Sequence, residues 1–230
     1  MDAPGVCGST TWDSGSVKSR RPPLSRGRIV DAAITLIDEG GLEHFSMPKL
    51  AAVLAVRTSA LYRHFADREA LLAEIARQIS AGDEPPALLP AASEWTEFFV
   101  AQSMQLRRRI LRHPNCAPLI IQFMPKDGVF DQYEVLCQFL AAAGVPPGYH
   151  VRIVDALTAM TIGAAVLAES SADYTPKGRG PTPDADKHPA LTRALSAIGD
   201  ATADDLFAGF VRTYLQTILA EIHTEESLEQ

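Results

Sequence analysis

The sequence predicts an all-α protein with a small three-helix head at its N-terminus and a larger helical body behind it. Apolar residues recur at the spacing of one helix face from Leu24 to Ile222. Serine or aspartate precedes several of these segments, and glycine or proline follows them, as is typical of helix ends. The 230 residues carry a formal net charge of −7 and 47% are hydrophobic, which indicates an ordinary globular protein.

Charge is distributed unevenly along the chain. Residues 1–80 carry ten Lys/Arg and nine Asp/Glu residues, so the remainder carries a net charge of −8. Five basic residues and no acidic ones lie between Lys18 and Arg28. An acidic total argues against a general nucleic-acid coat protein. A basic front on an acidic chain instead indicates DNA binding at one end and another role at the other.

The chain begins with a tail, residues 1–23, that is rich in Gly, Ser, Thr and Pro and should be disordered in the free protein. Two interpretations of it remain open: an arm in a DNA minor groove, or a solvated segment without a role. The first predicted helix spans Leu24–Gly40 and is capped by Ser25. Its apolar face consists of Ile29, Ala32, Ala33, Leu36 and Ile37.

The stretch from Ser46 to Arg68 predicts two short helices joined by a tight turn. Ser46 caps the first helix, and Thr58 is expected to cap the second. Leu61 and Phe65 lie four residues apart and therefore face inward together. Once they are buried, the outward set is Ser59, Ala60, Tyr62, Arg63 and His64. Short side chains allow close approach to base edges, and the long donors reach bases or phosphates, so this helix suits a major groove.

A fourth helix is predicted from an Asp67 cap to about Ser80. It is the only covalent route from head to body. Arg68 at its start is expected to meet a DNA phosphate, and the free N–H groups of the helix can add a further contact.

These residues resemble the DNA-binding domain of the TetR (tetracycline repressor) family of transcription regulators. The similarity rests on Leu61-Tyr62-Arg63-His64-Phe65, followed by Asp67-Arg68 and Leu71-Leu72, and continues more weakly to about Ala220. It implies a DNA-binding domain over 24–80, a ligand-binding and dimerisation domain over 81–222, and a frayed acidic tail over 223–230. The implied DNA contacts are Lys49, Thr58, Ser59, Ala60, Tyr62, Arg63, His64 and Arg68. Core packing remains an alternative for Tyr62, and a surface position without a role for His64.

Two residues depart from the family pattern. Ala55 stands where a turn glycine is usual, and an alanine forced to positive φ costs about 1 kcal/mol. Pro48 stands where a polar DNA contact is common. It falls in the first turn of its helix, where proline is tolerated, so specificity must depend on the following helix.

The body is predicted to be helical beyond a proline-rich connection over 82–92. Its expected helices span 93–112, 117–124, 127–143, 149–169, 189–198 and 203–222, with Ser93 as the first cap and a long loop over 170–188. Residues 149–169 and 203–222 are expected to pair with their copies as a four-helix bundle. A homodimer is required because two recognition helices must reach major grooves about 34–36 Å apart, which implies a near-palindromic double-stranded operator.

Five basic residues gather at the end of the first body helix: Arg107, Arg108, Arg109, Arg112 and His113. They complement the negative end of the helix dipole, so we interpret them as capping and solvated residues, not as a second DNA site.

The body is expected to bind a small apolar effector of unknown identity between its helices. The candidate ligand-binding residues are Phe98, Gln102, His113, Asn115, Gln122, Tyr133 and Met160. Leu136 stands where the tetracycline-binding branch has a glutamine, and no chelating histidine is in clear register, so the sequence supports no assignment of tetracycline or of a metal as the ligand. A dimeric regulator without ligand control remains the alternative.

Other classes of protein find little support. Cys7, Cys116 and Cys137 form no disulfide framework, which favours a reduced, cytoplasmic protein. No apolar run is expected to approach the ~20 residues that span a bilayer, so no membrane role is predicted. The sequence contains no nucleophile elbow, P-loop, dinucleotide fingerprint or zinc signature. His113 lies near Asn115 and Cys116, but this group alone does not indicate a catalytic site. We therefore predict no enzyme activity, no catalytic residue and no cofactor.

Overall fold

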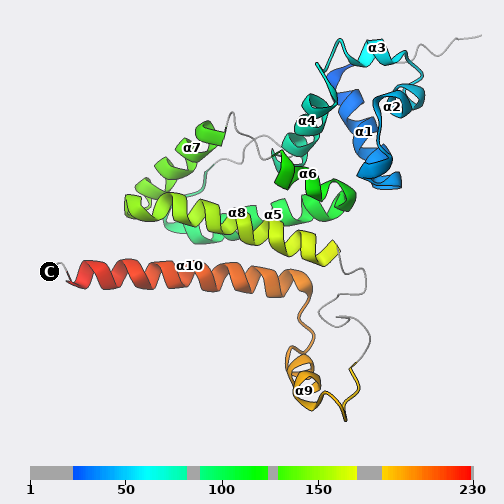
Figure 1. The fold of residues 1–230 in the computed structure, drawn as a ribbon. Coiled ribbons are helices and arrows are strands. Elements are labelled where there is room, and N and C mark those ends of the chain that lie inside the picture. The colour runs from blue at the N-terminus through cyan, green and yellow to red at the C-terminus, as the bar shows by residue number, and fades with distance from the viewer. Residues whose placement is uncertain (1–22, 82–88, 124–128, 170–182, 229–230) are drawn as a thin grey trace, which may run out of the picture.

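The computed structural model describes residues 23–81, 89–123, 129–169 and 183–228. The described residues are helical, without strands, so the predicted fold class is confirmed (Figure 1). The α-helices are α1 Arg26–Gly40, α2 Met47–Val53, α3 Thr58–Leu61, α4 Arg68–Ala81, α5 Trp95–Arg112, α6 Ala117–Gln122, α7 Val129–Ala142, α8 Pro147–Glu169, α9 Pro189–Ala197 and α10 Ala203–Leu228. Short 3₁₀ turns η1, η2 and η3 span Leu42–His44, Ala92–Glu94 and Pro114–Cys116. The predicted tail over 1–23, except its last residue, and most of the predicted loop over 170–188 lie outside the described residues.

Side-chain caps define the helices of the head. The Ser25 hydroxyl accepts from the Arg28 amide at 3.3 Å, and the Ser46 hydroxyl accepts from the Lys49 amide at 3.4 Å. The Asp67 carboxylate accepts from the Ala70 amide at 2.7 Å and begins α4. These three predicted caps are confirmed. Each one satisfies an N–H group that the helix itself leaves unpaired.

Two other expected caps were wrong. Thr58 is the first residue of α3, whose N-cap is Arg57 and has no side-chain hydrogen bond. Ser93 lies within η2, and the N-cap of α5 is Glu94. In both places the hydroxyl residue lies one position away from the N-cap, where a side chain can accept from the free N–H groups of the first turn.

The head and the body share a continuous apolar core. Leu71 and Ile75 of α4 are fully buried in one cluster with Leu119 and Ile120 of α6. A second cluster fills the space between α5, α7, α8 and α10, where Ile153 and Val211 are fully buried. The position of α6 is therefore coupled by packing to α4, which leads to the DNA-binding end.

Helix α8 is longer and more apolar than we expected from the sequence. Its segment Pro147–Ala168 has 22 residues with a mean hydropathy of 1.7, long and apolar enough to cross a membrane by length and composition. The expectation that no apolar run approaches this length was wrong. In the structure α8 packs against α5, α6, α7 and α10, as the central helix of a folded body does.

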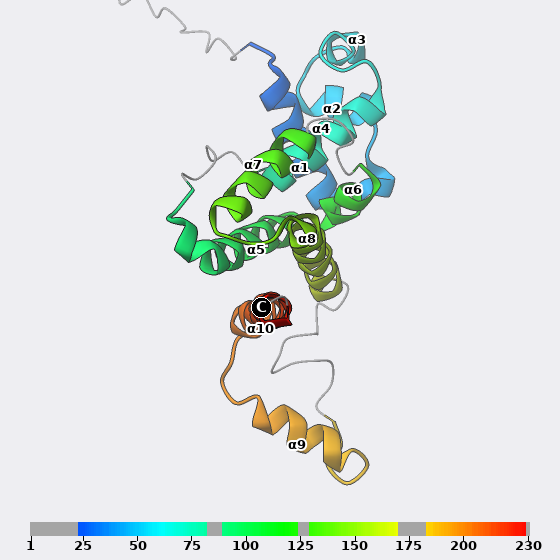
Figure 2. The ribbon, with the colours of Figure 1, turned by 90° about the vertical axis from the view of Figure 1, so that its left-hand side faces the viewer.

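Helix α10 is longer than expected and runs to Leu228, so the predicted frayed tail begins inside a helix. Its side away from α5 and α8 carries Leu206 and Phe210, which are 40% and 55% exposed. Helix α9 stands away from the rest of the body in both views, and none of its residues is buried (Figure 2).

Candidate nucleic-acid interface

A tight turn between α2 and α3 sets the angle of the candidate recognition helix. Ala55 adopts φ 53° and is the only non-glycine residue with positive φ in the described part of the chain. The Val56 amide donates to the Ala51 carbonyl at 2.9 Å and closes the turn. The expected alanine strain is therefore present at this position.

The buried and exposed sides of the recognition segment agree with the sequence prediction. Leu61 is fully buried and Phe65 is 2% exposed. Tyr62 is 49% exposed, which leaves its ring available to a partner. Ser59 and Arg63 are also exposed, whereas Thr58, Ala60 and His64 are half-buried. The segment lies at the end of the head farthest from α10 in both views (Figures 1 and 2).

Arg26 holds the end of this segment, a role that was not predicted from the sequence. Its guanidinium donates to the His64 carbonyl and lies 4.2 Å from the centre of the Phe65 ring. It also lies 3.8 Å from the Glu74 carboxylate on α4. The side-chain hydrogen bond and charge of Arg77 are the main influences that lower the pKa of Glu74. A basic residue in the first turn of a helix opposes the helix dipole, and this was the available signal that Arg26 has a partner.

The other two candidate DNA contacts are engaged with the head itself. Lys49 Nζ donates to the His44 carbonyl at 2.8 Å. The Arg68 guanidinium lies 5.5 Å from the centre of the Phe45 ring and is exposed at the start of α4. Both cations stay at the surface, but aromatic and carbonyl groups of the head restrict where they point.

The candidate effector residues fall into separate places. Phe98 of α5 packs edge-on against Phe139 of α7, with ring centres 5.0 Å apart. Tyr133 and Met160 are partly buried against the same cluster. The Tyr133 hydroxyl donates to Asp155 on α8. Burial first, and then this bond, raise the pKa of Tyr133 from 10.0 to about 12.

The other four candidates do not lie in that cluster. His113 and Asn115 contact Asp38 of α1, where the body meets the head. Gln122 is exposed at the end of α6, and Gln102 is half-buried on α5. An acidic residue in the last turn of a helix opposes the dipole, and Asp38 carried that signal.

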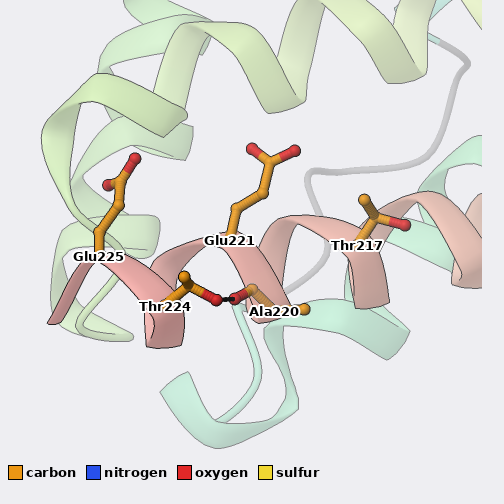
Figure 3. A pocket seen from close by; sticks show the side chains of 5 residues that line it. All are labelled: Thr217, Ala220, Glu221, Thr224 and Glu225. Carbon is orange, nitrogen blue, oxygen red and sulfur yellow. Dashed lines mark hydrogen bonds between the residues drawn. The ribbon is translucent and has the colours of Figure 1, made fainter. Parts of the chain in front are cut away.

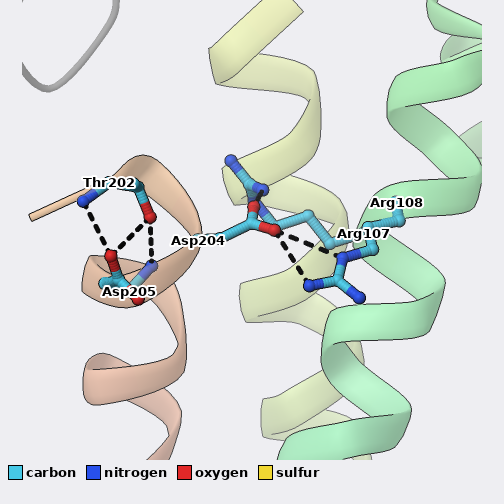
Figure 4. Close-up of polar contacts among 5 residues, drawn as sticks. All are labelled: Arg107, Arg108, Thr202, Asp204 and Asp205. Atoms are coloured by element: carbon cyan, nitrogen blue, oxygen red, sulfur yellow. Dashed lines mark hydrogen bonds and ion pairs between the residues drawn. The ribbon is translucent and has the colours of Figure 1, made fainter.

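Within the basic run at the end of α5, Arg108 and Arg112 are exposed as expected, but Arg107 is not. Arg107 is 4% exposed and pairs with Asp204 in the first turn of α10 (Figure 4). Arg108 reaches the other oxygen of Asp204 at 3.2 Å. A capping box of Thr202 and Asp205 begins α10 and holds Asp204 toward the two guanidiniums.

A hollow on α10 is unrelated to these candidates (Figure 3). It has a volume of about 410 Å³ and is lined by Thr217, Ala220, Glu221, Thr224 and Glu225. All five residues come from one helix, and the Glu221 carboxylate pairs with Arg152 at 2.8 Å. A single helix face does not enclose a small molecule, so this hollow does not serve as the effector site.

Comparison with known families gives two matches. The model described as bacterial regulatory proteins of the tetR family matches residues 29–75. The model described as the tetracyclin repressor-like C-terminal domain matches residues 89–225. Together they cover the head and nearly all of the body.

Individual relatives agree with these matches. The tetracycline repressor protein class D of Escherichia coli is 27% identical over 80% of this chain and 84% of its own. An HTH-type transcriptional regulator of Saccharopolyspora erythraea is 33% identical over 73% of this chain and 69% of its own. Among solved structures, Streptomyces coelicolor ActR in complex with (S)-DNPA superposes with a TM-score of 0.67 at 24% identity, covering 87% of this chain and all of ActR.

Proposed function

Because the chain belongs to the TetR family of bacterial transcription regulators, we propose that its α3 segment reads the major groove of a near-palindromic operator. The protein is a dimeric, ligand-responsive DNA-binding regulator and not an enzyme. One observation carries the assignment of the contact surface. Burial of Leu61 and Phe65 leaves Tyr62 and Arg63 facing solvent at the far end of the head.

Within this surface we assign two kinds of contact. Thr58, Ser59, Ala60 and Arg63 lie toward the bases. Tyr62, His64, Lys49 and Arg68 hold the phosphates on either side. Arg63 is the one long donor among the base-facing residues, so it supplies most of the discrimination.

The test is operator selection from random DNA with the wild-type dimer and with Arg63→Ala. A guanine contact is worth about 1–3 kcal/mol, so the variant should lose preference at one position of each half-site. Arg212→Ala is the control, because Arg212 is a half-exposed arginine of the body that pairs with Glu97, away from the head, and its loss should leave base preference unchanged. Equal weakening on every sequence, together with a shallower salt dependence, would instead make Arg63 a phosphate contact.

The dimer is proposed to form through the outer faces of α8 and α10. Four large apolar side chains on these faces remain 40–68% exposed in the single chain: Val151, Leu167, Leu206 and Phe210. Pairing of the two helices with their copies would bury them in a four-helix bundle. We place the protein in the cytoplasm, where the operator is.

The effector site is proposed between α5, α7 and α8, near Phe98, Gln102, Tyr133 and Met160. Phe98, Tyr133 and Met160 are partly buried in one apolar cluster, and the Tyr133 hydroxyl adds a polar group. Such a lining suits a planar apolar molecule with a few polar substituents. Two neighbours of similar fold have bound minocycline and actinorhodin.

The effector would release repression if it binds more tightly to the conformation of the dimer that cannot bind DNA. A preference of 1–3 kcal/mol gives about 5–150-fold release. Calorimetric screening of polycyclic aromatic compounds tests this, with Met160→Trp as the variant that fills the space. A hit that binds wild type and Met160→Trp equally would place the site elsewhere.

A further inference from the structure

Three side chains of the body converge on one residue of the head. His113 Nδ1 lies 2.7 Å from a carboxylate oxygen of Asp38. Asn115 donates its amide to the Asp38 carbonyl at 2.9 Å, and the Cys116 thiol lies 3.8 Å from the second carboxylate oxygen. We call these contacts the Asp38 clasp.

The clasp corrects two unfavourable features at the end of α1. The Asp38 carboxylate lies in the last turn of the helix, where the dipole disfavours negative charge. The Asp38 carbonyl belongs to the last turn, whose carbonyls have no partner within the helix. His113 faces the first group and Asn115 satisfies the second. The Asp38 and His113 side chains are only 25% and 35% exposed, so the contact is partly shielded from water.

The same region of the body also holds the second helix that leads out of the head. Arg109 donates to the Ser80 carbonyl in the last turn of α4 at 2.8 Å. The end of α5 and the adjoining η3 turn thus cap the C-terminal ends of α1 and α4 together. Because the body contacts the head at two helix ends, the head cannot rotate relative to the body without breaking one of these contacts.

We propose that Asp38 is a positioning residue that sets the orientation of the head, and through it the distance between the two recognition helices of the dimer. This proposal rests on the proposed function as a dimeric operator-binding regulator. A molecule that displaces η3 then acts on α1 through the clasp, in addition to acting on α4 through the packing of α6. His113 and Asn115 are therefore coupling residues between body and head.

The test uses full-length protein and a set of operators that differ only in half-site spacing. Asp38→Ala removes the carboxylate contacts of the clasp, with His113 and Cys116, and keeps the backbone carbonyl that accepts from Asn115. Asp31→Ala is the matched control, because Asp31 also lies on α1 but accepts from Gln78 of α4, within the head, at 3.1 Å. Both variants lose one carboxylate from the same helix, so their effects on charge are equal.

Wild type and Asp31→Ala should bind one spacing best. Asp38→Ala should lose about tenfold in affinity at that spacing while losing less at neighbouring ones, because its heads sample more orientations. Base preference within a half-site should stay unchanged in all three proteins. An Asp38→Ala protein with the wild-type spacing profile, or with the same loss at every spacing, would overturn the proposal.

A second measurement does not need DNA. A double-mutant cycle of thermal unfolding with Asp38→Ala and His113→Ala should show coupling between the two side chains, which lie 2.7 Å apart, and additive effects would refute the clasp. If the wild-type dimer selects no paired half-sites, the proposed function fails, and the cycle still decides whether the clasp exists. Asn115→Ala also serves in the spacing assay if Asp38→Ala folds poorly.

Discussion

Replacing Asp204 with alanine should destabilise the protein far more than breaking an ordinary surface ion pair. Its partner Arg107 has a side chain only 5% exposed, and Asp204 is 38% exposed. The Nε atom of Arg107 is buried without a hydrogen-bond partner in the described structure, so Asp204 supplies most of the compensation for the buried charge. The variant would leave that charge unpaired inside the body.

The magnitude follows from the exposure of the two partners. Removing one partner of a fully buried pair costs about 3–5 kcal/mol. Asp204 is partly in water, and the Arg107 guanidinium would still contact the Phe207 ring, whose centre lies 5.4 Å from it. We therefore expect Asp204→Ala to lower the free energy of unfolding by about 2 kcal/mol, half of the cost for a fully buried pair. For a chain of this length such a loss lowers Tm by about 4–8 °C.

The assay is thermal unfolding followed by circular dichroism at one fixed protomer concentration, because a dimer is stabilised by its own concentration. Glu97→Ala is the control, since Glu97 and Arg212 pair at 3.0 Å with side chains 63% and 48% exposed. That change should cost less than about 1 kcal/mol.

A double variant, Arg107→Met with Asp204→Ala, separates charge from packing. Replacing both members of a buried pair by apolar groups is often nearly neutral, so the double variant should recover most of the lost stability. The reasoning fails if Asp204→Ala costs no more than Glu97→Ala, or if the double variant is as unstable as Asp204→Ala.

Three further changes test other parts of the molecule. Ala55→Gly should raise Tm by about 1–2 °C, because relief of the positive-φ strain exceeds the entropy that glycine adds to the unfolded chain; a lower Tm would contradict this. Arg26→Lys keeps the charge but not the planar fork over Phe65, so operator affinity should fall several-fold with an unchanged salt slope in fluorescence anisotropy. A reduced slope would make Arg26 a phosphate contact. Tyr133 stabilises the fold fully below pH 10, and this contribution should vanish as the pH rises toward 12. Absorbance titration at high pH should therefore show a late-titrating tyrosine that is missing in Tyr133→Phe, and an unchanged titration would refute the assignment.

The head could be predicted from the sequence because its signals are local. Leu61 and Phe65 lie on one side of a single turn, and Ser25, Ser46 and Asp67 each precede the helix that they cap. Such patterns need only helix geometry. Thr58 shows the limit of this reasoning, since a hydroxyl caps a helix only at the N-cap position, and here the helix begins one residue earlier than predicted, at Thr58 itself.

The body could be predicted as a set of helices, but the partners of its charged residues could not. Arg107 and Asp204 are 97 residues apart, and Asp38 and Asn115 are 77 residues apart. Periodicity shows which face of a helix is apolar and does not show which distant helix covers it. For that reason a buried arginine looked solvated in the sequence, and the contacts of His113 and Asn115 with Asp38 were not predicted.

The distribution of the core decides how a signal can pass from effector to DNA. If the head had a separate core, a shift in the body could be absorbed by the connection between them. In this chain Leu71 and Ile75 of α4 are buried with Leu119 and Ile120 of α6, so a movement of α6 leaves a gap or an overlap beside α4. Either costs about 1–3 kcal/mol when one large side chain loses its fit, which is the size of coupling that a 5–150-fold change in DNA affinity requires. Packing through α4 and the clasp on α1 therefore transmit the same displacement to two helices of the head, and removing only one of them should weaken the response without abolishing it.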